Sequence, residues 1–410
     1  MLDRNSLTIF YYFLLVFVIL EIISPKFIIN PISNFPYSAG RMGFIILGII
    51  GLKKEIIDYD ISVFFVGFII IGFLVGSLYS VNVSKSIQIS LGTGLLYIAS
   101  IGFGRILLAN STTRLFDVLF IITFLYWANY IYGPINAGEI DLSIDFNSTL
   151  QTTVMYNRHI IGLPLTMSSI YLVIRIIEYG AKGIKIYFSY ILSFVIIFIT
   201  TFLTFMIHSR SNLLFYFIVL GMYFLNITGK INIKRVAFGF SFLFIIYFYL
   251  YNSIFDYNDM VSQRFFIGTT AYTIESTQTR FQLYGNFFGH FFQQPLGIGL
   301  FEPYIDLGYI RALMHNQYLS FIVSAGILGI PAVFILFKII FKTLFKKKIK
   351  KNNIQRLFSK EGWAIFVPLK YSMILFFFTL TTVESGGLLF LFMLSLLFEL
   401  HRKIYLSHKI

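Results

Sequence analysis

Long apolar runs constrain the fold of this chain more than any other feature of its sequence. A helix of about 20 apolar residues crosses a hydrocarbon core of roughly 30 Å, and such runs recur along the 410 residues. Charged residues make up only 12% of the chain, whereas they make up roughly 25% of soluble domains. We therefore predict a single polytopic domain over residues 1–410, an all-α integral membrane protein. About twelve transmembrane helices are expected, near residues 7–23, 40–52, 61–80, 86–108, 114–132, 159–177, 184–207, 211–228, 234–251, 314–341, 363–382 and 386–401.

Basic residues lie at alternate gaps between these runs and predict the orientation of the chain. The strongest group lies in the loop 342–360, and smaller groups lie near 53–54, 105–114, 182–185 and 230–235. Because Lys and Arg mark cytoplasmic loops, we expect these gaps and both termini in the cytoplasm. The net charge of +14 then reflects topology, and no nucleic-acid partner is expected. The N-terminal run lacks a small-residue cleavage site, so we expect it to be retained as the first helix.

Two long loops, 133–158 and 252–313, fall on the opposite side of the membrane. Arginine is the main basic residue on that side, where lysine occurs only as Lys26 and Lys85. A guanidinium offers a planar fork of donors that holds phosphate or carboxylate bidentately, so the pattern favours an anionic ligand outside. Snorkelling at helix ends is the alternative explanation for each of these arginines, which are Arg41, Arg158, Arg210, Arg264, Arg280 and Arg311.

The longer outer loop contains an amphipathic segment, "IESTQTRFQLYGNFFGHFFQQPLGIG". At helical spacing one face is polar (Gln278, Gln282, Asn286, Gly289, Gln293), and the other is aromatic (Phe281, Tyr284, Phe288, Phe291, Phe292). This pattern predicts a helix on the membrane surface that ends at Pro295 and Gly297. Arg280 falls at the flank of the apolar face, near Phe287, although an ordinary interfacial helix would look the same.

Polar residues interrupt the apolar runs at two further places. His208, Ser209 and Arg210 separate two runs with almost no loop, and His315 and Asn316 stand at the predicted outward end of the run 314–341. Asn316 is also a good helix cap, and a lone histidine at an interface is often structural. Ionisable groups at membrane depth are nevertheless candidates for function.

Three segments resemble, in their order and spacing, the bacterial O-antigen polymerase and O-antigen ligase family. "HSRSNLLFYFIVLG" is similar to the family's Ser-Arg segment, and "TRFQLYGNFFGHFFQQPLGIG" to its arginine-led outer helix ending in Pro-Leu-Gly-x-Gly. "MHNQYLSFIVSAGILG" resembles its His-Asn motif followed by a Gly-rich helix. The likeness covers roughly residues 200–335, and "YNRHIIGLPL" at 156–165 resembles the family more weakly.

The resemblance implies a GT-C-like membrane glycosyltransferase that uses no metal or other cofactor and inverts the anomeric carbon. Its donor would be an undecaprenyl-diphosphate-linked oligosaccharide, with Arg210 and Arg280 on the diphosphate and His315 at the acceptor. Arginines can stabilise the charge that grows on a leaving diphosphate, and a neutral imidazole can accept the proton of the acceptor hydroxyl. Asn316 would orient the sugar or cap the helix. Membrane lipids and a chain-length regulator would be the other partners.

Other residues are candidates for substrate binding by their location. Arg158, Arg264 and Arg311 lie in or beside the outer loops. Acidic residues of the loop 133–158 could bind sugar hydroxyls or assist the base, namely Glu139, Asp141 and Asp145. Tyr318, with Tyr304 and Tyr309, is placed to stack on a sugar. The tripeptide "DYD" at 58–60 has a metal-binding form but falls on the predicted cytoplasmic side, so we treat it as a chance match.

Three functions therefore stay open, all of them in a bacterial inner membrane. The preferred one is a polymerase of O-antigen or capsular polysaccharide, which moves a growing glycan onto the next lipid-linked repeat unit. A ligase would use the same donor but move the finished glycan onto the lipid A–core of lipopolysaccharide. A flippase or transporter would be expected to show repeated halves and polar residues near the middle of the membrane.

Overall fold

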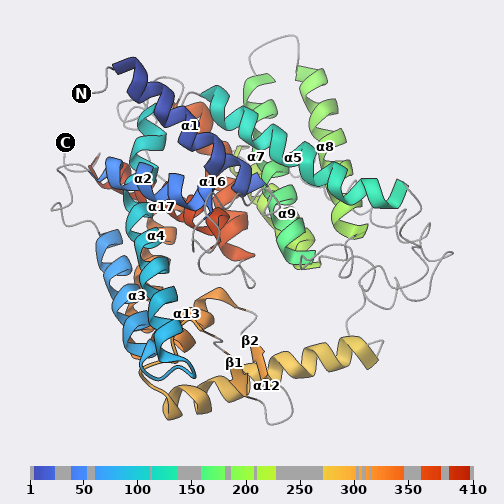
Figure 1. Ribbon diagram of the computed structural model, residues 1–410. Helices are drawn as coiled ribbons and strands as arrows, with labels where there is room; N and C mark the ends of the chain where they lie inside the picture. Colours follow the sequence, from blue (N-terminus) through green and yellow to red (C-terminus); the bar gives the residue numbers. More distant parts are fainter. Residues whose placement is uncertain are drawn as a thin grey trace. The chain divides into compact units, whose positions relative to one another are not determined.

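A computed structural model describes residues 4–23, 38–52, 61–110, 113–136, 158–180, 186–206, 210–227, 271–301, 304–306, 311–313, 316–345, 362–379 and 387–406 (Figure 1). Within these residues the chain is helical apart from one short pair of strands. The α-helices are α1 (Arg4–Ile23), α2 (Ala39–Gly51), α3 (Ile61–Ser77), α4 (Val83–Asn110), α5 (Thr113–Asn136), α7 (Arg158–Gly180), α8 (Ile186–Met206), α9 (Arg210–Ile227), α12 (Ala271–Gln293), α13 (Gln317–Ala325), α14 (Gly329–Leu344), α16 (Gly362–Phe378) and α17 (Leu388–Leu406). A 3-10 turn, η2 (Gly326–Leu328), joins α13 to α14, and β1 (Tyr304–Asp306) pairs with β2 (Arg311–Leu313).

Apolar helices confirm that this is an all-α membrane protein. By length and hydropathy alone, four segments of the described chain match membrane spans: Val83–Ala109, Arg114–Tyr132, Tyr187–Thr204 and Gln317–Leu344, the last of which is divided by a turn. Shorter apolar helices cover five more of the predicted runs. The predicted run 234–251 lies outside the described residues.

The helices form two compact units, each described here by itself. Unit 1 comprises Met1–Leu115, Phe281–Trp363 and Leu380–Ile410, and unit 2 comprises Phe116–Arg280 and Ala364–Thr379.

Small residues let the helices of unit 1 approach closely. Gly48 of α2 lies against the backbone of Ala99 in α4, and Gly51 lies against Gly102 one turn further on. Gly104 of α4 lies in the same way against Ser395 of α17. Because lipid is as apolar as a leucine side chain, close backbone packing of this kind is a main source of helix association in membranes.

The predicted span 314–341 is a helical hairpin. The expectation of one continuous transmembrane helix over these residues is therefore wrong. The rings of Tyr318 in α13 and Phe337 in α14 pack against each other with centroids 4.6 Å apart. In a continuous helix they would lie roughly 28 Å apart along the axis. Gly329 at the start of α14 also lies within contact distance of the Phe321 carbonyl. The chain therefore turns back at Gly326–Leu328, where glycine permits the reversal.

The hairpin runs beside α3 in unit 1. Phe321 of α13 contacts Phe65 and Phe73 of α3, with ring centroids 6.4 Å apart in both pairs. The last turn of α13 lies against Gly72 and Gly76 near the end of α3. The two helices are therefore parallel, and the middle of α13 lies beside the middle of α3.

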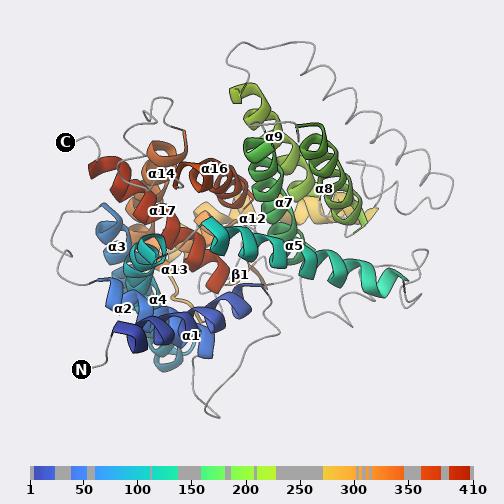
Figure 2. The ribbon, with the colours of Figure 1, turned by 90° about the horizontal axis from the view of Figure 1, so that it is seen from above.

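Unit 2 is built around α7, α8 and α9, which lie side by side (Figure 2). Ser169 of α7 shares a hydrogen bond of 2.7 Å with the Tyr216 hydroxyl of α9, and Thr200 of α8 donates to Ser169 Oγ at 2.8 Å. Further along the same two helices, the Tyr223 hydroxyl of α9 donates to Glu178 of α7 at 3.4 Å. From the first contact to the second, the residue number rises in both helices, from 169 to 178 in α7 and from 216 to 223 in α9. Helices α7 and α9 are therefore parallel, and they begin at the same end of unit 2.

Candidate functional site

The candidate residues fall into two groups. One group lies at an end of unit 1 and the other at an end of unit 2. In unit 1 the group surrounds α12, β1–β2 and the hairpin α13–α14. In unit 2 it surrounds the first residues of α7 and α9.

Helix α12 lies across the end of α3 and α4 in unit 1, at a steep angle to both (Figure 1). Its bounds agree with the predicted helix, which ends before Pro295. The sequence predicted one apolar face for this helix, whereas the structure shows two, one buried and one exposed. Leu283 and Phe287 are buried with Ile298 and Val323, and Leu319 and Ile322 of α13 pack against this cluster.

The second apolar face of α12 is exposed. Tyr284, Phe288 and Phe292 follow one another at helical spacing and are 39%, 65% and 77% exposed. An exposed aromatic stripe on a helix that lies across the ends of apolar helices is typical of a membrane-surface helix. One side of α12 therefore fixes it to the protein while the other side is free to meet lipid.

The segment "PLGIG" binds the tip of the hairpin through its backbone. The amides of Ile298 and Gly299 donate to the carbonyls of Val323 and Ser324 at 3.2 and 3.0 Å, and the Ile327 amide donates to the Pro295 carbonyl at 2.7 Å. Gly297, Gly299 and Gly326 have φ angles of 84°, 73° and 60°, which favour glycine. The two glycine-rich segments that the sequence separates thus form one interlocked turn. No side-chain chemistry is needed to explain these glycines.

Asn316 caps α13. Its side-chain oxygen accepts from the amides of Tyr318 and Leu319 at 3.0 and 3.2 Å, so the capping interpretation of this residue is confirmed. The cap lies roughly 14 Å from the tip of the hairpin, given about 1.5 Å of rise per residue. Leu319 and Ile322, within two turns of this cap, pack against the cluster that Leu283 and Phe287 of α12 form. The outward position of Asn316 stays a prediction.

Tyr318 and Arg311 flank this cap in the sequence. The Tyr318 ring packs on Phe337, so part of its surface is already used by the protein. Arg311 pairs across the strands with Asp306, and Tyr304 pairs with Leu313. The strands thus bring an acidic and a basic residue opposite each other just before the start of α13.

In unit 2 two of the predicted arginines begin parallel helices. Arg158 is the first residue of α7, and Arg210 is the first residue of α9. From the contact between Ser169 and Tyr216, the two helices begin within roughly 7 Å of each other along their common axis. Thr204, which is fully buried near the end of α8, has a hydroxyl with no hydrogen-bond partner among the described residues. Two helix N-termini, two arginines and a buried hydroxyl therefore gather at one end of this unit.

This arrangement is electrostatically suited to an anion. The first amides of a helix have no partner within it and carry the positive end of the helix dipole, equivalent to roughly half a charge. Phosphate groups bind at such ends. Two parallel helices with arginine at their first positions add their fields at the same place.

The other predicted site residues are not placed together by the structure. Arg280 lies on α12, but only its backbone is described. His315, Arg264, Glu139 and Asp141 lie outside the described residues. The described residues contain no group of His, Cys, Asp and Glu that could hold a metal ion.

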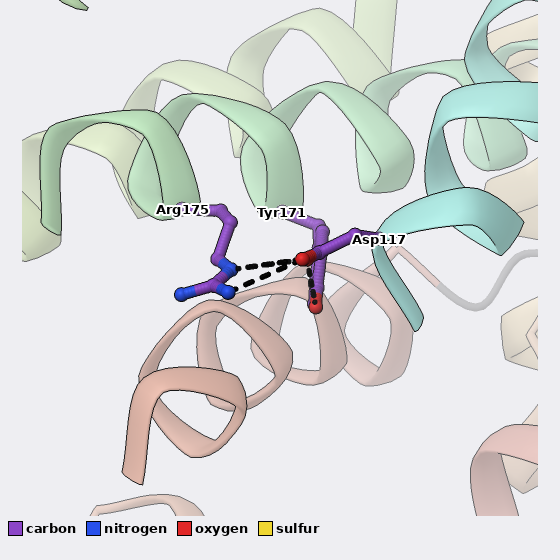
Figure 3. Close-up of polar contacts among 3 residues, drawn as sticks. All are labelled: Asp117, Tyr171 and Arg175. Carbon is purple, nitrogen blue, oxygen red and sulfur yellow. Dashed lines mark hydrogen bonds and ion pairs between the residues drawn. The ribbon is translucent and has the colours of Figure 1, made fainter. Parts of the chain in front are cut away.

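Ion pairs within the helices escaped the sequence analysis. Asp117 of α5 accepts from Arg175 of α7 through both carboxylate oxygens, with N–O distances of 3.0 to 3.3 Å, and from the Tyr171 hydroxyl at 3.0 Å (Figure 3). The carboxylate is fully used inside unit 2, so this cluster joins α5 to α7. Its only sequence signal is a pair of opposite charges near the ends of two apolar runs.

One of the arginines that the sequence predicts on the outer side is also paired. Arg41 of α2 lies with its Nε 3.4 Å from Glu21 Oε1 of α1, and Ser38 donates to the same carboxylate. Because Glu21 is buried, this pair fixes α1 to α2. Arg41 is therefore better explained by structure than by an external anion.

His290 lies in the last turn of α12, where its Nε2 atom is buried and has no hydrogen-bond partner among the described residues. Burial lowers the pKa of this histidine. The neutral imidazole is therefore favoured at this position.

Comparison with protein-family models, with curated proteins and with solved structures found no match. The functional argument therefore rests on the residues and the geometry given above.

Proposed function

We propose that this protein is a polysaccharide polymerase of the O-antigen or capsular type. It would transfer a growing glycan from undecaprenyl diphosphate onto a lipid-linked repeat unit, on the outer face of a bacterial inner membrane. In this proposal it is an inverting, metal-independent enzyme of GT-C-like architecture.

One observation carries the proposal: Arg158 and Arg210 begin two parallel helices at the same end of unit 2. A diphosphate leaving group gains negative charge as the glycosyl bond breaks. Fixed positive groups that meet this charge stabilise the transition state more than the ground state. Two helix ends and two guanidinium forks are such groups, and they act without a metal.

The membrane setting agrees with a lipid-linked donor. The described segments long enough to cross a membrane give the protein a bilayer location. The exposed stripe of Tyr284, Phe288 and Phe292 on α12 suits the headgroup region. A polyprenyl diphosphate has its phosphates at this depth and its chain in the hydrocarbon, so a surface helix of this kind suits such a donor.

For the acceptor we assign His315 as the general base and Asn316 as the cap that holds the start of α13 in place. A sugar hydroxyl attacks poorly unless its proton is removed, and a positioned base contributes about 10²–10⁴-fold in rate. Arg280 would join the diphosphate site. Arg264, Arg311, Glu139, Asp141 and Tyr318 are assigned to the sugar and diphosphate contacts.

The ligase remains the alternative with the same donor, and the structural argument above applies equally to it. The flippase alternative predicts polar groups near the middle of the membrane, and the layer of Ser169, Thr200 and Tyr216 is such a group in unit 2. These hydroxyls bond to one another, and Thr200 also donates to the Ile196 carbonyl at 2.7 Å. Because the layer is satisfied internally, we favour a structural role for it and retain the polymerase.

The test is a reconstituted reaction with one defined undecaprenyl-diphosphate repeat unit. The polymerase predicts a ladder of products on the lipid diphosphate without any added acceptor. A single product that appears only when lipid A–core is added would indicate the ligase. Movement of unchanged donor between the leaflets of a vesicle, without any new glycosidic bond, would indicate the flippase.

A further inference from the structure

Helix α8 carries two neighbouring buried hydroxyls that bond to no described residue. Thr201 is 5% exposed and Thr204 is fully buried, and the Oγ1 atom of each has no hydrogen-bond partner among the described residues. They are three residues apart, so they are neighbours on the surface of the helix. A buried hydroxyl without a partner costs free energy, so the pair requires an explanation.

Both threonines could satisfy their hydroxyls within the helix but do not. A threonine in a helix can donate to the carbonyl four residues earlier. Other buried threonines of the described helices do so at 2.7 or 2.8 Å, namely Thr123, Thr166, Thr200 and Thr379. Thr201 and Thr204 make no such bond to any described carbonyl. Their hydroxyls are therefore available to a group that comes from outside the helix.

The pair lies at the end of unit 2 where α7 and α9 begin. Only three residues separate the end of α8 from Arg210, the first residue of α9, so α8 ends close to where α9 begins. Thr200, one turn before Thr204, donates to Ser169 Oγ of α7 at 2.8 Å. Thr204 is therefore roughly 6 Å nearer than this contact to the first residues of α7 and α9. Those residues are Arg158 and Arg210, the arginines of the proposed diphosphate site.

We propose that Thr201 and Thr204 bind the diphosphate of the lipid-linked donor by donating their hydroxyls to its phosphate oxygens. This inference rests on the proposed function and adds two residues to the same site. Hydrogen bonds to an ionised acceptor are roughly twice as strong as those between neutral groups. The positive ends of α7 and α9 attract a negative acceptor, so a phosphate suits the two donors better than a neutral sugar does.

The experiment measures the affinity of the purified full chain in detergent for undecaprenyl diphosphate, together with the unfolding temperature of the unliganded protein. Thr204→Val keeps the size of the side chain and removes the hydroxyl. Its affinity should fall about tenfold, because a hydrogen bond to a charged acceptor is lost. Its unfolding temperature should equal that of the parent or slightly exceed it, because no bond within the protein is lost. Thr201→Val should behave in the same way, whereas Thr204→Ser should bind nearly as well as the parent.

Two further variants of α8 serve as controls. Ser193 is 3% exposed and its hydroxyl also has no partner among the described residues, but it lies roughly 16 Å from Thr204 along the helix. Ser193→Ala should therefore leave the affinity unchanged. Thr200→Val removes hydrogen bonds that the structure contains, so it should lower the unfolding temperature.

The possible results separate this inference from the proposed function. If Thr204→Val binds undecaprenyl diphosphate as tightly as the parent while Arg210→Lys binds it more weakly, the arginine site stands and the threonine proposal is wrong. If Thr204→Val lowers the unfolding temperature as much as Thr200→Val, its hydroxyl has a structural role and the threonine proposal is again wrong. Inorganic diphosphate that binds as tightly as undecaprenyl diphosphate would assign the hydroxyls to a soluble anion. A parent protein that does not bind undecaprenyl diphosphate would overturn both proposals.

Discussion

Replacing Gly326 with alanine should loosen the junction between the hairpin tip and the "PLGIG" segment. Gly326 has φ 60° and ψ −141°, a region that only glycine occupies readily. A Cβ atom there would lie 2.5 Å from the Gly297 amide nitrogen and still closer to the Pro295 carbonyl oxygen. The atoms in the way belong to the backbone, so no side-chain rotation relieves the contact.

The expected cost follows from two contributions. The unfavourable backbone conformation costs about 1–3 kcal/mol. Displacing the segment lengthens the hydrogen bond from the Ile327 amide to the Pro295 carbonyl, worth about 0.5–1.5 kcal/mol. Gly326→Ala should therefore lower the free energy of unfolding by about 2–4 kcal/mol, measured by equilibrium unfolding in mixed micelles.

Gly67→Ala is the matched control in the same unit. A Cβ at Gly67 of α3 meets nothing within 4 Å, and alanine is favoured over glycine in a helix by up to about 1 kcal/mol. This variant should be neutral or slightly more stable than the parent. If the two variants unfold with the same free energy, the interlocked turn does not exist as described.

Three further predictions concern other parts of the chain. Asn316→Ala should lower the free energy of unfolding by about 1 kcal/mol, because two amides lose their acceptor, and Asn316→Asp, which keeps an acceptor oxygen, should restore it; equal losses in both would contradict the capping role. Burial lowers the pKa of His290 below its ordinary value of 6.5, so the unfolded chain takes up the proton first, and the free energy of unfolding should be constant above that pH and fall as the pH drops through 6.5. His290→Gln should remove this pH dependence from a titration of the unfolding free energy. An unchanged titration in the variant would refute the role of His290. In this cysteine-free chain, an impermeant thiol reagent should label Ser276→Cys but not Asn352→Cys from outside the inner membrane, and the reverse pattern would invert the proposed orientation.

Hydropathy predicted the helices of unit 2 closely because each apolar run is bounded by polar residues. The predicted run 159–177 became α7, and 211–228 became α9. The same property hid the hairpin, since the run 314–341 is apolar on both sides of its turn. The reversal depends on the backbone angles of Gly326. It also depends on the hydrogen bond from the Ile327 amide to the carbonyl of Pro295, which is distant in sequence. Hydropathy contains neither kind of information.

The candidate site shows the same division. Asn316 was predicted as a cap because its side chain acts on the two residues that follow it, which is a local property. The turn that follows α13 was not predicted, because it depends on contacts of Gly326 with residues that are distant in sequence. The burial of Leu283 and Phe287 also escaped notice, since the larger aromatic residues of α12 dominate its apolar pattern. The pairing of Asp117 with Arg175 joins two helices and leaves no periodic signal.

The most direct test of the proposed function is the rate at which purified protein releases undecaprenyl diphosphate from its glycan donor. At matched protein levels, Arg158→Lys and Arg210→Lys should each lose most of this rate, because lysine keeps the charge but not the fork of donors. Arg114→Lys, at an exposed position near the start of α5, should retain the parent rate. Full release by both Arg158→Lys and Arg210→Lys would contradict the claim that the paired ends of α7 and α9 hold the diphosphate.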